Sequence, residues 1–317
     1  MKAVVLDGYT LNPGDLDWKI INSVDDLIIY DRTKKEEIAN KIGDAEIVLT
    51  NKTPIDKNVL GACPNIRFIS VLATGYNVVD IVETKKRNII VSNVPDYGTH
   101  AVSQFAIALL LEVCCKIGIH NRLVHEGEWH KQGEWCFSTN PLIELNEKTM
   151  GIIGFGRIGK RTAEIAKALG MHVIVYDPNN ISDIDDIQYV SLDELYTVSD
   201  VIVLHCSLNE NNYQMINKNS LNKMKKSTII INNARGGLIN EYDLAYSLNH
   251  NEIAAAGLDV TLKEPINNDN PLLKAKNCII TPHMSWLAKE ARQRIMITTN
   301  QNILAFSKGK PIHVVND

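Results

Sequence analysis

The chain lacks the features that mark several large classes of protein. Its net charge is only −4 over 317 residues, so no basic excess is present to attract nucleic acid or an anionic membrane. The longest apolar stretch, Phe105–Leu111, stops at Glu112 and is too short to span a bilayer. The first residues show no signal-peptide pattern. We therefore expect about two globular domains, with no nucleic-acid or membrane partner.

Cysteine pairs of the CxxC type are also absent. The six cysteines are Cys63, Cys114, Cys115, Cys136, Cys206 and Cys278. Several lie in apolar runs, where a buried free thiol is normal. This pattern argues against a metal site and against a disulfide framework. It predicts a reducing, cytoplasmic compartment.

Short apolar runs of strand length alternate with helical patterns along the chain. A first series extends from Lys2–Leu6 to Ile89–Val94, and a second extends from Gly151 to Cys278–Thr281. Strands that alternate with helices predict parallel sheets covered on both faces. Two series therefore predict an α/β fold with two doubly wound domains. The last helical pattern, Lys289–Ser307, follows the second series, and periodicity alone does not assign it to either domain.

Residues 148–178 carry the most informative motif. An apolar run leads into Gly154-Phe-Gly156-Arg-Ile-Gly159, a helical pattern follows, and a second apolar run ends at Asp177. Strand, glycine turn, helix, strand and acid occur in the order of a dinucleotide site. Gly154 permits the turn, Gly156 admits a pyrophosphate, and Gly159 allows close helix packing. The helix N-terminus would bind the phosphates, and Asp177 would accept the ribose hydroxyls.

The same glycines fit the beginning of a phosphate loop of the nucleoside triphosphatases. That loop needs Ser or Thr after its lysine to hold magnesium, whereas this chain has Arg161 after Lys160. The charge of Asp177 would repel a 2′-phosphate, and no arginine follows closely to neutralise one. We therefore predict NAD rather than NADP or a nucleoside triphosphate.

Three polar residues follow later strands of the second series. Arg235 comes after the run at 229–234, Glu264 after the run at 255–259, and His283 after Cys278–Thr281. Ligands in such folds bind outside the carboxyl ends of the strands. We expect all three side chains at that edge, although each alone could be an exposed loop residue.

The three residue types suit the reduction of a 2-keto acid. A guanidinium can grip a carboxylate with two parallel hydrogen bonds. Histidine exchanges protons near neutral pH. A carboxylate that is hydrogen-bonded to the imidazole orients the ring and stabilises its protonated form. Together they predict hydride transfer between a nicotinamide and a 2-keto acid.

These motifs resemble those of the D-isomer-specific 2-hydroxyacid dehydrogenases over essentially the full chain. The segments that carry the resemblance are the glycine motif with Asp177, Asn-x-x-Arg-Gly ending at Gly236, Asp259-Val-x-x-x-Glu-Pro265 and Thr281-Pro-His283. The resemblance implies that Arg235 binds the substrate carboxylate and carbonyl. It makes His283 the general acid/base and Glu264 its partner.

The resemblance also implies the domain organisation. A flavodoxin-like substrate domain would comprise residues 1–98 and 288–317. A Rossmann NAD-binding domain, residues 99–287, would be inserted into it. The family forms homodimers, and the apolar segment Phe105–Leu111 is consistent with a dimer helix or with a buried core helix.

Finer features are similar to the glycerate dehydrogenase (hydroxypyruvate reductase) branch. They are Val71–Asn77, Tyr97–Val102, Gly133–Phe137 and His283–Trp286. In that branch, the backbone amides of Thr74 and Gly75 would hold the substrate carboxylate. Trp286 would close the pocket over a small substrate, or would simply be a packed aromatic at a helix start. The implied reaction reduces hydroxypyruvate or glyoxylate to D-glycerate or glycolate.

The motif and the resemblance together predict a set of cofactor-binding residues. They are Gly154, Phe155, Gly156, Arg157, Ile158, Gly159, Asp177, His205, Cys206, Ser207, Asn233, Ala234, Asp259, His283 and Ser285. Two of them depart from the family pattern. The family often has proline where Ser207 stands, and threonine or isoleucine where Asn233 stands.

Other functions remain as alternatives. A formate dehydrogenase would have glutamine in place of Glu264. The L-specific lactate and malate dehydrogenases place the glycine motif near the N-terminus. An NAD-sensing, corepressor-like binding protein could keep the same three polar residues, and a dehydrogenase of the same family could act on another 2-keto acid.

Overall fold

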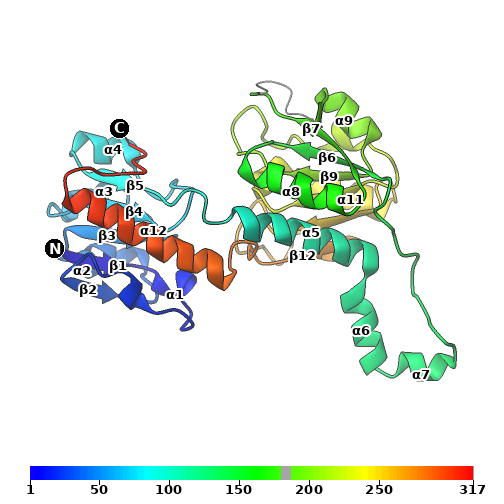
Figure 1. The fold of residues 1–317 in the computed structure, drawn as a ribbon, viewed down its shortest axis with the longest axis horizontal. Helices are drawn as coiled ribbons and strands as arrows, with labels where there is room; N and C mark the ends of the chain where they lie inside the picture. Colours follow the sequence, from blue (N-terminus) through cyan, green and yellow to red (C-terminus); the bar gives the residue numbers. More distant parts are fainter. Residues whose placement is uncertain (180–186, 317) are drawn as a thin grey trace. The chain divides into compact units, whose positions relative to one another are not determined.

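The computed structural model describes residues 1–179 and 187–316. The chain divides into two compact units (Figure 1). Unit 1 comprises Met1–Gly98 and Trp286–Asp317, and unit 2 comprises Thr99–Ser285. The second boundary falls after Ser285, two residues earlier than the sequence predicts.

Unit 1 is built on a five-stranded sheet with the order β2-β1-β3-β4-β5. The strands are β1 (Lys2–Val5), β2 (Asp26–Ile29), β3 (Ile47–Thr50), β4 (Phe68–Val71) and β5 (Ile90–Ser92). All neighbouring strands pair in parallel. This is the flavodoxin-like order, as predicted. β3 and β4 are buried along their whole length, because helices cover both faces of a parallel sheet.

Short helices and one long one surround this sheet. They are α1 (Gly8–Leu11), α2 (Ile38–Ile42), α3 (Lys57–Ala62), α4 (Ile81–Lys86) and α12 (Lys289–Ser307). Short 3₁₀ turns lie at Trp18–Ile20 and Lys35–Glu37. α12 packs on β4 (Figure 1), where the rings of Phe68 and Phe306 stack with centroids 4.6 Å apart. The C-terminal helix therefore belongs to unit 1.

Unit 2 is built on a seven-stranded sheet with the order β12-β11-β10-β9-β6-β7-β8. The strands are β6 (Thr149–Ile153), β7 (His172–Tyr176), β8 (Gln188–Tyr189), β9 (Val201–Leu204), β10 (Ile229–Asn232), β11 (Ala255–Leu258) and β12 (Cys278–Ile280). These neighbouring strands pair in parallel. The strand order reverses at β6, which lies between β7 and β9. This switch point is where doubly wound sheets bind dinucleotides.

The helices of unit 2 form two hydrophobic cores on the two faces of the sheet. The helices are α5 (Thr99–Cys115), α6 (Ile117–His125), α7 (Glu128–Gln132), α8 (Arg157–Ala168), α9 (Leu192–Val198), α10 (Lys218–Leu221) and α11 (Glu241–Asn249). 3₁₀ turns lie at Gly236–Leu238 and Pro271–Lys274. One core joins α5 and α8 to the sheet, and the other joins α9, α10 and α11 to it. Ile152 and Ile153 point to opposite cores, as alternation along a strand requires.

The apolar segment Phe105–Leu111 lies in α5, with Leu109 and Leu110 in the core. It is thus a core helix in this structure. α6 and α7 extend away from the unit 2 sheet as an arm (Figure 1). Among the described residues, no single helix has the length and apolar character to cross a membrane. Only α5 and α6 taken together, with a 56° bend between them, meet those two criteria.

Candidate active site

The glycine turn joins β6 to α8 at the switch point of the unit 2 sheet. Gly154 has φ +95°, and a side chain there would meet the backbone of Cys206 at 2.6 Å. Only glycine fits both conditions. A Cβ on Gly156, by contrast, would meet no atom within 4 Å. Gly154 is therefore packed against the loop after β9, whereas Gly156 faces open space. This open side leaves room for a phosphate group.

The first turn of α8 provides hydrogen-bond donors beside this opening. The first intrahelical bond runs from the N–H of Lys160 to the carbonyl of Gly156. The N–H groups of Arg157 and Ile158 therefore lack an intrahelical acceptor, as at every helix start. These donors and the positive end of the helix dipole favour an anion. Phe155 is mostly buried against Tyr189, with ring centroids 6.0 Å apart.

Asp177 follows β7 and ties that strand to the glycine turn. Its Oδ2 accepts the backbone N–H of Phe155 at 2.7 Å, and its Oδ1 accepts the N–H of Asn179 at 2.9 Å. A carboxylate has about four acceptor positions, so each oxygen can still accept a ribose hydroxyl. The two internal bonds hold the carboxylate in place before any ligand arrives.

The loop after β9 lies next to the glycine turn and carries two neutral side chains, those of His205 and Cys206. Nε2 of His205 lies 2.9 Å from the hydroxyl of Thr162 on α8, which joins the loop to the helix. Loss of hydration lowers the pKa of His205 to about 3 and raises the pKa of Cys206 to about 11. Both groups are thus neutral at pH 7. Ser207 is exposed, and its carbonyl accepts Nδ2 of Asn212.

Arg235 lies in the loop that follows β10. The backbone of this loop is shaped by Asn232, which accepts the N–H of Ala234 and donates to the carbonyl of Arg235. The guanidinium is exposed, and Nη1 donates to the carbonyl of Ala234 at 2.7 Å. A Cβ on Gly236 would lie 2.0 Å from the backbone of Thr261. The Arg235 loop therefore touches the loop that follows β11, the one that carries Glu264.

Glu264 and His283 form a hydrogen-bonded pair across two loops. Nδ1 of His283 lies 2.6 Å from Oε2 of Glu264. Both side chains are partly exposed, at 28% and 38%. The other oxygen of Glu264 accepts the N–H of Thr261 at 3.2 Å. Because a carboxylate accepts, Nδ1 carries the proton, and Nε2 is the ring atom left for a substrate.

Asp259 holds the backbone that presents His283. Its carboxylate is fully buried and accepts the hydroxyl of Thr281 at 2.6 Å and the N–H groups of Met284 and Ser285 at 2.8 Å. The carbonyl of Asp259 accepts the N–H of His283. His283 itself has φ +52°, an uncommon conformation for a residue with a side chain. We infer that this network stabilises the strained loop.

The other three predicted substrate residues lie in unit 1. Thr74 and Gly75 follow β4, and the hydroxyl of Thr74 donates to the carbonyl of Val94 at 2.9 Å. Among the described residues, neither backbone N–H has an acceptor. Trp286 is 8% exposed, and its ring meets that of Tyr97 edge-on at 6.4 Å. This environment fits a packed aromatic, and its contact with substrate stays a prediction.

Sequence reasoning missed Asp7 and Thr162. Asp7 follows β1, and its carboxylate accepts N–H groups of the loop after β3, at 2.6 to 2.9 Å. An acid at the end of a buried first strand is a signal that could have identified it. Thr162 lies within an ordinary helical pattern, so its contact with His205 could be found only from the fold.

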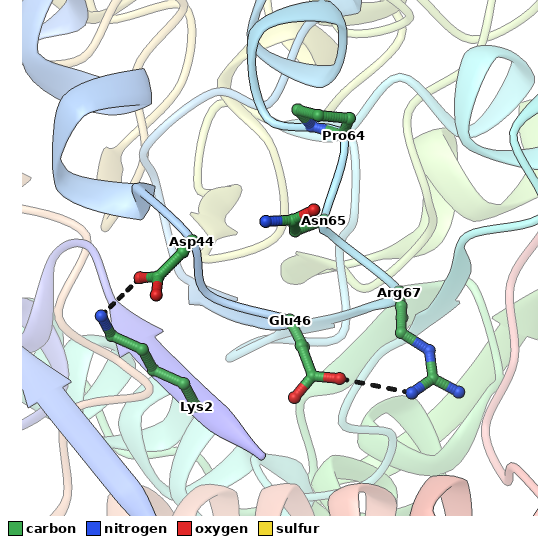
Figure 2. Close-up of a pocket in the computed structure, with 6 residues that line it drawn as sticks. All are labelled: Lys2, Asp44, Glu46, Pro64, Asn65 and Arg67. Atoms are coloured by element: carbon green, nitrogen blue, oxygen red, sulfur yellow. Dashed lines mark hydrogen bonds and ion pairs between the residues drawn. The ribbon is translucent and has the colours of Figure 1, made fainter.

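A shallow hollow lies at the opposite, amino-terminal edge of the unit 1 sheet. Figure 2 shows that Lys2 pairs with Asp44 and Arg67 pairs with Glu46. Lys2 begins β1, and Arg67 precedes β4. Because ligands of doubly wound sheets bind at the carboxyl ends of the strands, we interpret this hollow as an ion-paired surface and not as part of the candidate site.

Comparison with known proteins adds to this geometry. Residues 107–285 match the family model of the D-isomer specific 2-hydroxyacid dehydrogenase NAD binding domain. A hydroxypyruvate reductase of Blautia hydrogenotrophica is 56% identical, with 100% of both chains covered. A glycerate dehydrogenase of Methylorubrum extorquens is 38% identical over 88% of each chain. The solved D-2-hydroxyisocaproate dehydrogenase has a TM-score of 0.87 at 26% identity, with 100% of both chains covered.

Proposed function

The chain belongs to the family of D-isomer specific 2-hydroxyacid dehydrogenases, and we propose that it reduces hydroxypyruvate to D-glycerate, and glyoxylate to glycolate. The family makes it an NAD-dependent oxidoreductase that acts on the CH–OH group of 2-hydroxy acids. The observation that carries the proposed chemistry is the Glu264–His283 pair, in which Glu264 lies on the loop that touches the loop of Arg235.

The residues at the switch point fit an NAD molecule. The open face of Gly156 and the N–H groups of Arg157 and Ile158 would hold the pyrophosphate. Asp177 would hold the adenosine ribose through its remaining acceptor positions. Of the other predicted cofactor residues, His205, Cys206 and Ser207 lie after β9, Asn233 and Ala234 after β10, and Asp259 and Ser285 beside His283. When bound, the reduced cofactor supplies the hydride that the carbonyl carbon receives.

Arg235 would orient the substrate. Its exposed guanidinium has N–H groups left after the bond to the carbonyl of Ala234. Two of them can grip a carboxylate in parallel, which also fixes the adjacent carbonyl. In unit 1, the N–H groups of Thr74 and Gly75 have no acceptor among the described residues, and we propose that they bind an anion. This accounts for a substrate with a carboxylate next to a ketone.

His283 would donate the proton to the carbonyl oxygen. Its Nδ1 is held by Glu264 at 2.6 Å, so the imidazolium would deliver the proton from Nε2. The negative charge of Glu264 would stabilise the imidazolium that donates the proton. In the reverse direction, Nε2 would accept the proton of the hydroxyl group. Glu264 thus supports a proton shuttle.

Turnover across a panel of 2-keto acids tests the proposal. The wild type should oxidise NADH with hydroxypyruvate and glyoxylate, with kcat/KM higher than for pyruvate or a branched 2-keto acid. A higher kcat/KM for one of the latter would assign another 2-keto acid. NADH binding without turnover on any of them would favour the corepressor-like alternative. His283→Ala is the matched control, because it removes the shuttle and leaves the glycine turn intact.

We also propose a homodimer in the cytoplasm. The α6–α7 arm and the segment after it expose apolar side chains, with Trp135 92% and Ile117 63% exposed. We propose that these side chains are buried against a second copy of the chain. All six cysteines are free, as expected in a reducing compartment. Sedimentation equilibrium of the wild type tests the dimer, and Trp135→Glu should shift it toward monomer; a monomeric wild type would contradict it.

A further inference from the structure

Glu241 is the first residue of α11 and lies shortly after Arg235 in the sequence. Its carboxylate accepts two hydrogen bonds from the loop that follows β11. Oε1 accepts the backbone N–H of Leu262 at 2.8 Å, and Oε2 accepts Nδ2 of Asn270 at 2.7 Å. These two partners lie on either side of Glu264 in the sequence. Glu241 therefore joins both ends of the segment that carries Glu264 to the beginning of one helix.

The backbone around Glu264 has little packing to hold it. Residues 262–265 are exposed to solvent, so the hydrophobic core does not fix their position. Thr261, in contrast, is buried, and its N–H donates to Oε1 of Glu264 at 3.2 Å. Hydrogen bonds to a charged acceptor are stronger than those between neutral groups. A carboxylate that binds the next N–H in the chain, that of Leu262, therefore restrains the backbone from which Glu264 extends.

The N–H of Leu262 lies where two loops of the site touch. A Cβ on Gly236 would meet the backbone nitrogen of Leu262 at 2.5 Å. Gly236 directly follows Arg235, and α11 begins after the 3₁₀ turn that Gly236 opens. One short stretch of chain thus carries Arg235 and also supplies the carboxylate that holds the Glu264 loop.

We propose that Glu241 is a positioning residue for the proton shuttle and that it acts through Glu264. The inference rests on the function proposed above, in which Glu264 holds Nδ1 of His283. By binding the N–H of Leu262, Glu241 fixes the backbone from which the Glu264 carboxylate reaches the imidazole. Small displacements of a catalytic group cost large factors in rate, so this bond affects turnover although it lies at an exposed loop.

Exchange of the hydrogen-bonding groups of Glu241 and Asn270 tests the proposal. Glu241→Gln leaves one oxygen for two donors and sets its NH2 group against an N–H. Asn270→Asp sets a second carboxylate against that of Glu241, and it keeps the oxygen that accepts the N–H of Leu272. Each single variant should lower kcat for hydroxypyruvate about tenfold, with KM and NADH affinity within about twofold of the wild type.

The double variant turns the bond between the two side chains around. The amide introduced by Glu241→Gln can donate to the carboxylate introduced by Asn270→Asp, and the net charge of the pair is unchanged. Because the two positions interact directly, their effects should not add, and kcat should return to within about twofold of the wild type. A double variant with a larger loss than either single variant would overturn the proposed bond.

The route through Glu264 is tested in a second background. If Glu241 acts by placing the Glu264 carboxylate, Glu264→Ala removes the group that is placed. Glu241→Gln should then lower kcat about tenfold in the wild type and by less than about twofold in the Glu264→Ala enzyme, since coupled residues are not additive. An equal loss in both backgrounds would overturn this route.

Asp243→Asn is the matched control. Asp243 lies in the same first turn of α11, and its Oδ2 accepts the backbone N–H of Lys218 at 2.9 Å. Lys218 begins α10, which carries none of the predicted site residues. This variant should lose stability in urea unfolding as Glu241→Gln does, and it should keep kcat within about twofold of the wild type.

Three results would overturn the inference. They are an unchanged kcat in Glu241→Gln and Asn270→Asp, a rise in KM at unchanged kcat, and an equal loss of kcat in Asp243→Asn. Either of the first two variants serves by itself should the other fail to fold. A wild type that turns over another 2-keto acid would contradict the proposed substrate alone, and the variants are then compared on that acid.

Discussion

Each unit uses a buried aspartate at a carboxyl end of its sheet to hold the loop of another strand. In unit 1, Asp7 accepts the N–H groups of residues 51–53 and the hydroxyl of Thr53. In unit 2, Asp259 accepts the hydroxyl of Thr281 and the N–H groups of residues 284 and 285. The two carboxylates are 6% and 0% exposed. In both units, a buried aspartate therefore fixes the backbone of a loop at the carboxyl edge of the sheet.

The two units differ in the residues that lie on the loop held by the aspartate. The loop held by Asp7 carries Asn51, Lys52 and Thr53, whereas the loop held by Asp259 carries His283, which meets Glu264. A buried aspartate at this position therefore indicates a loop held in place, and does not by itself indicate a catalytic site. Chemistry requires a titrating group on the loop and a partner for it.

Removal of His283 should have the largest effect on activity of the variants considered. His283→Ala deletes the proton donor, and general acid catalysis of this kind contributes about 10²–10⁴-fold. We expect kcat for hydroxypyruvate to fall by that factor, while NADH affinity, measured by fluorescence titration, stays within about threefold. Loss of NADH binding instead would mean that the imidazole is part of the cofactor site and not the donor.

The two aspartates offer a direct test of the comparison. Asp259→Asn and Asp7→Asn each replace one acceptor oxygen with an NH2 donor that faces N–H donors, and each should lower the free energy of unfolding by about 3 kcal/mol. Only Asp259→Asn should also reduce kcat, by about tenfold or more, because the His283 loop relaxes. Urea unfolding and steady-state kinetics measure the two effects. An equal loss of kcat in both variants would remove the distinction between the two loops.

Loss of the partner of His283 tests whether the pair acts as a unit. Glu264→Gln removes the negative charge that stabilises the imidazolium. We expect kcat for hydroxypyruvate to fall about tenfold or more, because the ring is no longer oriented by a carboxylate and its positive charge is no longer stabilised. Steady-state rates of NADH oxidation, with the wild type as reference, measure this loss. An unchanged kcat would assign Glu264 a structural role.

Cofactor preference should change by a smaller factor. Asp177→Ser keeps a hydroxyl acceptor near the ribose and removes the charge that would repel a 2′-phosphate. The ratio of kcat/KM for NADH to that for NADPH should fall about tenfold, which corresponds to ~1.4 kcal/mol. Asp193→Ser, an exposed acid on α9 that pairs with Lys223, is the control and should leave the ratio unchanged. A fixed ratio in Asp177→Ser would assign the preference to another residue.

The last prediction concerns stability in acid and not catalysis. The pKa of His205 is lowered from 6.5 to about 3 by loss of hydration. Between these values the unfolded chain binds a proton that the folded chain does not, so stability falls as the pH falls below about 6.5. His205→Asn lacks this linkage, and its unfolding free energy should decline less steeply over that range. Parallel curves for the two proteins would contradict the lowered pKa.

Regular elements were the most predictable part of this fold. The runs that begin and end the two predicted series overlap β1, β5, β6 and β12, because buried parallel strands read as apolar runs. The predicted helix at Lys289–Ser307 matches α12. Sequence reasoning missed β8, whose two residues, Gln188 and Tyr189, are too few to form a pattern. It also gave no indication of the break at Lys116 between α5 and α6, where φ is +52°.

The candidate site was predictable in its residue types but not in its contacts. Arg235, Glu264 and His283 could be located because each follows a strand of a doubly wound sheet. The contacts of Asp259 and Asn233 could not be predicted in this way. Asp259 accepts the N–H groups of residues 284 and 285, and Asn233 donates to the carbonyl of residue 102. Such bonds depend on how loops fold over the sheet, and no periodicity encodes them.

The sequence alone determined the α/β class, the dinucleotide turn and the residue types of the reaction, since these depend on local patterns of apolar, glycine and charged residues. Only the tertiary structure decided that the C-terminal helix packs in unit 1, that Nδ1 of His283 meets Glu264 and that Nδ2 of Asn233 donates to the carbonyl of Val102. The physical reason is that burial and hydrogen bonding join residues far apart in the chain, so they are properties of the packed molecule.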